Sequence, residues 1–217
     1  MPITWYAMIG LFAALLINRA ADCWLNPLPQ QCGVTRRPLR QWLVLVGTPI
    51  LMVFFALAQE NARDGWPYGL FGVVFLLLGV IDLEQKRIPN VIVIPAIIIA
   101  LFVQWQVGQL LLGVAGAALA LVLFGLLFIV GRRFFGTGAL GLGDVKLAVL
   151  LGAIFGFTSI AYVLLLGILL AGLASAILLF TGLAKRGDTI PYGSFLALSG
   201  LVGLFAVGLT SGMLSPF

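Results

Sequence analysis

Two aspartates at the polar edges of very apolar segments are the residues best suited to chemistry in this sequence. Asp82 lies in GVIDLEQKRIPN (79–90), and Asp144 lies in GTGALGLGDVKL (136–147). A carboxylate beside a membrane span is energetically costly, so by default it marks a working site. Two such groups on one side of a bilayer can serve as a general acid and a general base. The pair therefore predicts an aspartic peptidase embedded in a membrane.

The two carboxyl groups are expected to divide the acid–base work. Asp82 follows an apolar run and precedes a polar stretch, so we expect it at the membrane face. One aspartate, protonated, would donate a proton, and the other, ionised, would accept a proton from a water molecule. The sequence does not assign these two roles, because a coupled pair titrates as a unit.

The residues around Asp144 suit a substrate-binding loop. Gly141 and Gly143 place no side chain beside the carboxylate, so an extended substrate backbone could come close to it. A helix that begins here puts its positive end beside Asp144, and Lys146 adds a positive charge. A structural explanation also exists: a Gly-rich loop followed by a helix with Asp144 as its N-cap.

The segment after Asp82 has the same two interpretations. Pro89 suits the first turn of a following helix, so Pro89 and Asn90 can be read as a polar turn that starts the next span. In the functional interpretation, these two residues support the site. Glu84, at the inner face, could attract a basic substrate segment, although ordinary solvation of a loop residue is the simpler explanation.

Composition predicts an all-α polytopic membrane protein. The chain has 217 residues, of which 62% are hydrophobic and 9% charged, and its mean hydropathy is +1.19. Soluble domains carry about 25% charged residues, so a water-soluble globule is excluded. The net charge of +5 is scattered in short clusters between apolar runs, which indicates cytoplasmic loop anchors rather than nucleic-acid binding. The first apolar segment is expected to be a retained helix rather than a signal peptide.

Charge placement predicts about eight spans with the N-terminus outside. The run 145–182 is too long for one crossing, and basic residues stand at both of its ends, so we expect a reversal near Gly156–Ser159. All basic residues except Arg63 then lie on the cytoplasmic side.

Small residues such as Gly113 and Gly116 are expected to let helices approach closely. The apolar runs are 3–19, 41–58, 67–83, 90–108, 109–130, 145–182 and 191–212, with an uncharged turn at 104–109.

Three motifs in order resemble those of the type IV prepilin peptidase family of GxGD aspartic proteases. They are Asp82 followed by Ile88-Pro89-Asn90, then GLGDVKL (141–147), and then IPYGSFLAL (190–198), which is similar to the family's Pro-Phe-Gly-Pro segment but has Ser194 where Pro is usual. The resemblance implies that Asp82 and Asp144 are the catalytic pair, with no metal or organic cofactor. It implies cleavage after the short basic leader of prepilins or pseudopilins, at the cytoplasmic face of the bacterial inner membrane.

The first inner loop departs from the family pattern. Many members carry there a larger domain with two Cys-x-x-Cys pairs that bind zinc, and they also methylate the new N-terminus. Here, residues 20–40 supply only Cys23 and Cys32, and the chain has no His. Two thiolates do not complete a tetrahedral zinc site. We therefore expect an N-terminal two-span region (1–64) with a shortened loop, a six-span peptidase core (65–217), no metal and no methyltransferase activity.

Two other functions could use the same pair of aspartates. A presenilin-like intramembrane protease shares the Gly-x-Gly-Asp element, but Ile81 precedes Asp82 where those families have Tyr, and no Pro-Ala-Leu segment occurs. A proton- or cation-coupled transporter could use the same aspartates, but it would favour acidic residues in the middle of spans. In this chain, every charge maps to the end of a span.

Overall fold

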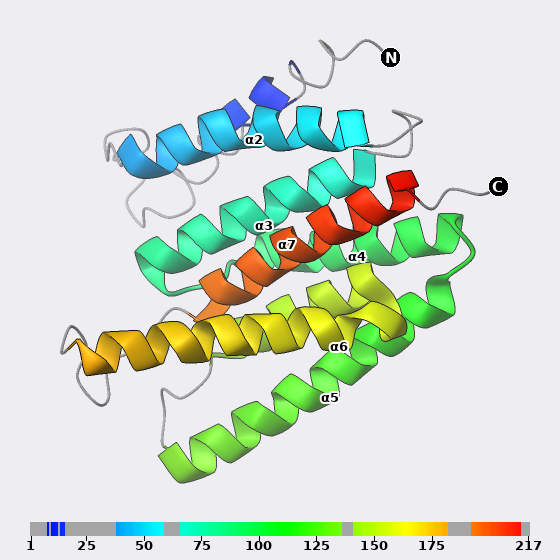
Figure 1. Ribbon diagram of the computed structural model, residues 1–217. Coiled ribbons are helices and arrows are strands. Elements are labelled where there is room, and N and C mark those ends of the chain that lie inside the picture. The colour runs from blue at the N-terminus through cyan, green and yellow to red at the C-terminus, as the bar shows by residue number, and fades with distance from the viewer. Residues whose placement is uncertain are drawn as a thin grey trace. The chain divides into compact units, whose positions relative to one another are not determined.

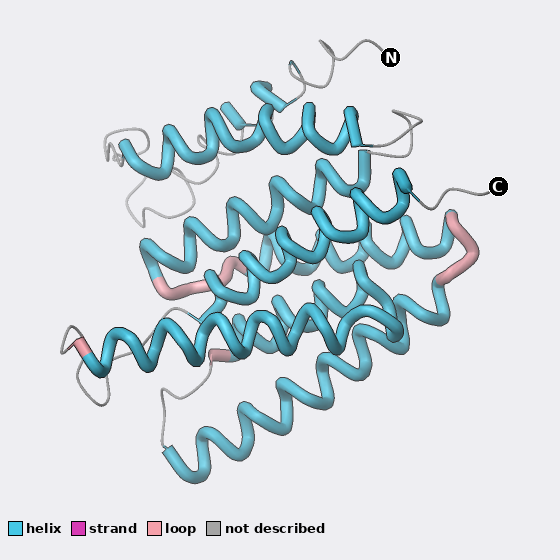
Figure 2. Tube along the Cα trace, viewed as in Figure 1, coloured by secondary structure: helices cyan, strands magenta, loops and turns pink. Residues whose placement is uncertain are grey.

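The computed structural model describes residues 8, 10–12, 14–15, 38–58, 66–135, 141–181 and 192–213, and these residues are helical apart from short turns. None of them lies in a strand (Figure 2), so the all-α prediction is confirmed for the described chain. The helices, labelled in Figure 1, are α2 (Pro38–Ala58), α3 (Trp66–Gln85), α4 (Asn90–Gln106), α5 (Leu110–Phe135), α6 (Leu142–Phe180) and α7 (Tyr192–Met213).

Several of these helices have the length and composition of membrane spans. Among the described residues, Trp66–Gln85, Leu110–Phe134 and Leu142–Phe180 are long and apolar enough to cross a bilayer. Val44–Phe55, Asn90–Gln106 and Tyr192–Val207 are shorter apolar helices. Most of the predicted first span and loop 20–40 fall outside the described residues, so the eight-span topology with an outer N-terminus stays a prediction.

The predicted reversal in the long run 145–182 is confirmed. Helix α6 is interrupted at Gly156, where φ is 65° and ψ is 179°, and the chain turns back there (Figure 1). Glycine adopts this left-handed conformation without the penalty that a Cβ atom would bring. The Gln104 side-chain amide donates to the carbonyl of Ile154 at 2.8 Å. This bond satisfies one of the acceptors that a helix leaves unpaired where it ends.

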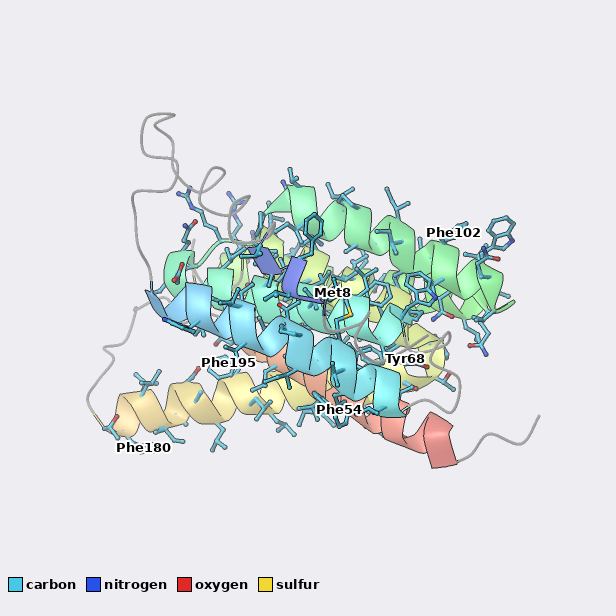
Figure 3. The ribbon with its side chains drawn as sticks, turned by 90° about the horizontal axis from the view of Figure 1, so that it is seen from above. Met8, Phe54, Tyr68, Phe102, Phe180 and Phe195 are labelled. Atoms are coloured by element: carbon cyan, nitrogen blue, oxygen red, sulfur yellow. The ribbon has the colours of Figure 1, made fainter. Side chains whose placement is uncertain are left out.

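The predicted uncharged turn between the fourth and fifth spans is also confirmed. Helix α4 ends at Gln106, α5 begins at Leu110, and Gly108 between them has a φ of 72°. Phe102, labelled in Figure 3, stacks edge-on against Trp105 with 5.7 Å between ring centroids. Trp105 is 61% exposed, as expected of an aromatic side chain at a membrane–water interface.

The chain divides into two compact units, and each forms its own contacts. One unit comprises Met1–Leu77 with Leu204–Phe217, and the other comprises Leu78–Gly203. In the first unit, the ring of Phe55 packs against Phe205 at 5.1 Å and against Tyr68 at 6.1 Å between centroids. The second unit holds both aspartates. The predicted domain boundary between residues 64 and 65 lies outside the described residues.

Helices α5 and α6 approach each other through glycines, as the sequence predicts. A Cβ atom built on Gly116 would lie 2.5 Å from the carbonyl oxygen of Gly152, and one built on Gly152 would collide with the carbonyl of Gly116. Both obstacles are backbone atoms, which cannot rotate away. Close contacts of this kind are typical of small-residue helix interfaces in membranes.

We expect Gly152→Ala to destabilise the protein by about 1–3 kcal/mol, because the added methyl group must push two helix backbones apart. Thermal unfolding of the purified protein in detergent measures this. Gly125→Ala is the matched control on α5, since a Cβ atom there meets nothing within 4 Å and alanine favours helix. Equal unfolding temperatures for the two variants would contradict the close packing.

Candidate active site

Asp82 lies in the last turn of α3, and its carboxylate meets the beginning of α7. The backbone N–H of Ser194 donates to Oδ2 of Asp82 at 2.7 Å. Ser194 is in the first turn of α7, where N–H groups lack acceptors within the helix and the helix dipole is positive. The Asp82 side chain is only 4% exposed. The buried carboxylate therefore has a donor from a segment more than a hundred residues away in sequence.

Gly193 is the residue that lets α7 come so close to Asp82. A Cβ atom built on Gly193 would lie 2.9 Å from Cγ of Asp82 and 2.7 Å from Cδ1 of Ile88. Both distances are shorter than a carbon–carbon van der Waals contact. The hydrogen bond between Ser194 and Asp82 thus depends on the missing side chain at Gly193.

Asp144 is held by the start of its own helix. Helix α6 begins at Leu142, and Gly141 is its N-cap with φ −87° and ψ 149°. The N–H of Gly141 donates to Oδ2 of Asp144 at 3.0 Å, which is the N3-to-cap half of a capping box. The structural alternative that Asp144 itself is the N-cap is therefore wrong, because the helix begins earlier than the expected residue 145. The Asp144 side chain is 8% exposed.

The short link between α3 and α4 connects the surroundings of the two aspartates. Lys86 ends α3 in a left-handed conformation with φ 52°, and its N–H donates to the carbonyl of Asp82 at 2.8 Å. After this turn, the side chain of Ile88 fills the space beside two glycines. A Cβ atom on Gly143 would lie 3.0 Å from Cβ of Ile88. A Cβ atom on Gly193 would lie 2.7 Å from Cδ1, at the other end of the Ile88 side chain. The face of Gly143 that was expected to admit substrate is thus covered by Ile88.

The other predicted site residues lie around this core. Lys146 donates to Oδ1 of Asn90 at 2.7 Å, which ties the start of α4 to the first turn of α6. Pro89 is the N-cap of α4 in an extended conformation, one position before the helix that it was expected to begin. Glu84 is half-buried, two residues after Asp82 on α3.

The structure brings the two carboxyl groups into one site. The glycines beside them, Gly193 and Gly143, contact the same Ile88 side chain. Within the described residues, no group of three or more His, Cys, Asp or Glu side chains is placed to hold a metal ion. Cys23 and Cys32 lie outside that part of the chain. The arrangement suits acid–base chemistry by two carboxyls.

Comparison with known proteins identifies the family. A family model described as the type IV leader peptidase family matches residues 69–177, just over half of the chain and including both aspartates. The chain belongs to the type IV leader peptidase family. The matched region includes the motif from Asp82 to Asn90 and the motif GLGDVKL (141–147). The start of α7 lies beyond it.

Curated relatives of this family member carry the name prepilin leader peptidase/N-methyltransferase. One from Pseudomonas putida is 30% identical over 131 residues, which cover 59% of this chain and 46% of the relative. One from Pseudomonas aeruginosa is 26% identical, covering 73% and 59%, and one from Aeromonas salmonicida is 29% identical, covering 83% and 62%. The chain therefore spans about half to two thirds of the length of these relatives. No solved structure matches the chain.

Three residues around the aspartates of this leader peptidase family member were not predicted as site residues from the sequence: Ile88, Gly193 and Ser194. The available signal was Gly193 next to the start of an expected span. Glycine inside a helix is about 1 kcal/mol less favourable than alanine, so such a glycine often has a packing reason. The partner in that packing could not be read from the sequence, because Asp82 is more than a hundred residues away.

Proposed function

We propose that this protein is an aspartic endopeptidase that removes the leader peptide from type IV prepilins or pseudopilins. The observation that carries the proposal is the pairing of two buried carboxyls, each held by backbone N–H donation at a helix start. Both carboxyls lie in the region that matches the leader peptidase family.

Two carboxyls in this arrangement can hydrolyse a peptide bond with a water molecule. The Gly141 N–H and the Ser194 N–H each hold Oδ2 of one carboxyl. In the proposed reaction, the other oxygen of each carboxyl acts on water or on substrate. The ionised carboxyl takes a proton from water as the hydroxyl attacks the scissile carbonyl carbon. The protonated carboxyl then gives its proton to the leaving amide nitrogen. Water supplies both the new hydroxyl and the proton that balance the cleavage.

The substrate and the location are part of the proposal. The basic leader would stay in the cytoplasm while the apolar helix of the prepilin docks laterally against the bundle. The enzyme would be a multi-pass protein of the bacterial inner membrane with about eight spans, an outer N-terminus and its site on the cytoplasmic face. The six-span core (65–217) would carry out cleavage, with no cofactor, nucleic-acid partner or methyl transfer. Detection of labelled methyl groups on cleaved pilin after incubation with S-adenosylmethionine would contradict the last point.

A leader-cleavage assay tests the proposed function. Detergent-solubilised protein is incubated with several prepilins that retain their leaders, and the products are identified by mass spectrometry and N-terminal sequencing. We expect one cut, directly after the basic leader. If every prepilin stays intact while proteoliposomes containing the protein take up protons or cations, the transporter alternative replaces this function.

A further inference from the structure

We propose that the backbone N–H of Ser194 is a positioning group for Asp82, so that the first turn of α7 forms a third structural part of the active site. This inference rests on the proposed function, because it concerns how one of the two proposed catalytic carboxyls is oriented. It goes beyond the two aspartate motifs, since Ser194 lies outside the region that the family model matches.

The geometry of the bond favours positioning over ordinary helix capping. Ser194 N lies 2.7 Å from Oδ2 of Asp82, a short distance typical of a charge-assisted hydrogen bond. The donor residue is 9% exposed and the acceptor residue 4% exposed, so bulk water cannot readily replace the bond. Ser194 is the third residue of α7, where the N–H has no acceptor within the helix itself.

The bond also fixes the direction of the catalytic oxygen. A carboxyl group rotates about a broad terminal torsion. The Ser194 N–H, together with a further backbone hydrogen bond from Gly193, fixes that torsion in Asp82. The Gly193 backbone limits the remaining space around Asp82. Without the Ser194 N–H, the carboxyl would keep only the Gly193 N–H as a backbone donor and would be held less firmly.

This donor is a feature of the chain itself. Ser194 stands where the resembling family segment usually has Pro, and Pro has no N–H. Ser194→Pro therefore removes the donor at a position in the first turn whose N–H has no acceptor within the helix. Ser194→Ala keeps the N–H and removes only the hydroxyl, so comparing it with the other variants separates the effects of these two groups. Replacing residue 194 by lactic acid gives an ester that lacks the same N–H without the proline ring.

Two readouts separate this inference from the proposed function. The first is prepilin cleavage, resolved into kcat and KM. The second is the rate at which an apolar carbodiimide labels Asp82, measured by mass spectrometry on the purified protein without substrate. We expect Ser194→Pro and the ester to lower kcat roughly ten- to hundredfold, as the loss of one hydrogen bond to a charged group implies. KM should change little, and Asp82 should be labelled faster, while Ser194→Ala, which keeps the N–H, loses less kcat and gains less labelling than either variant.

The other outcomes are equally specific. Wild-type kcat and labelling in the ester variant would overturn the inference, as would equal losses in Ser194→Ala, which would assign the effect to the hydroxyl. If no variant or wild-type protein cleaves prepilin but the labelling pattern is as expected, the positioning of Asp82 stands and the proposed function fails. A folded ester variant decides the matter if Ser194→Pro does not fold.

Discussion

Asp82→Asn and Asp144→Asn are each expected to lower kcat for leader cleavage by about 10²–10⁴-fold, the range that a general acid or base contributes. Asparagine has almost the same shape as aspartate and retains a carbonyl oxygen. It can therefore keep the acceptor role toward the Ser194 N–H or the Gly141 N–H. It cannot take a proton from water or give one to a leaving amine as a carboxyl does. The variants should thus fold and bind substrate but fail in chemistry.

The double variant adds a test of whether the two carboxyls act as a unit. If they do, Asp82→Asn with Asp144→Asn should be no slower than the slower single variant. Asp64→Asn is the control, because this residue is predicted on the outer side of the membrane and should retain wild-type kcat. Circular dichroism and thermal unfolding establish that each variant is folded. Cleavage by either single variant at more than a tenth of the wild-type rate would show that the pair is not the catalytic dyad.

The parts of the fold that could be predicted are those governed by local chemistry. Basic residues at both ends of 145–182 required an even number of crossings, and Gly156 provides the left-handed residue at which α6 reverses. The polar amides around Gln104 indicated the α4–α5 turn in the same way. Both features depend on residues close together in sequence, where charge, length and backbone freedom are informative.

The part of the site that could not be predicted depends on contacts between distant segments. Asp82 and Asp144 were found because a carboxyl at a membrane face is unusual wherever it occurs. Nothing near Asp82 in the sequence indicates that α7 supplies its hydrogen-bond donor. Likewise, Gly143 was expected to leave space for substrate, but Ile88 fills that space. A glycine shows where close approach is allowed, without showing what approaches.

Gly193→Ala is expected to lower kcat by about a hundredfold, the loss that a displacement of roughly 1 Å at a catalytic group can cause. The new Cβ atom would lie 2.9 Å from Cγ of Asp82 and 2.7 Å from Cδ1 of Ile88. Ile88 can yield by rotating the end of its side chain. Asp82 has a shorter side chain and can yield only by moving away from α7, which stretches its 2.7 Å bond to Ser194.

The stability of this variant should respond differently from its activity. Alanine is a better helix former than glycine by about 1 kcal/mol, which offsets part of the steric penalty in the first turn of α7. Gly172→Ala is the matched control, since a Cβ atom on this α6 glycine meets nothing within 4 Å. We expect both variants to unfold at similar temperatures and only Gly193→Ala to lose cleavage, with KM little changed. Full activity in Gly193→Ala would mean that Asp82 does not need the close approach of α7, and the Ser194 N–H could then not be its positioning group.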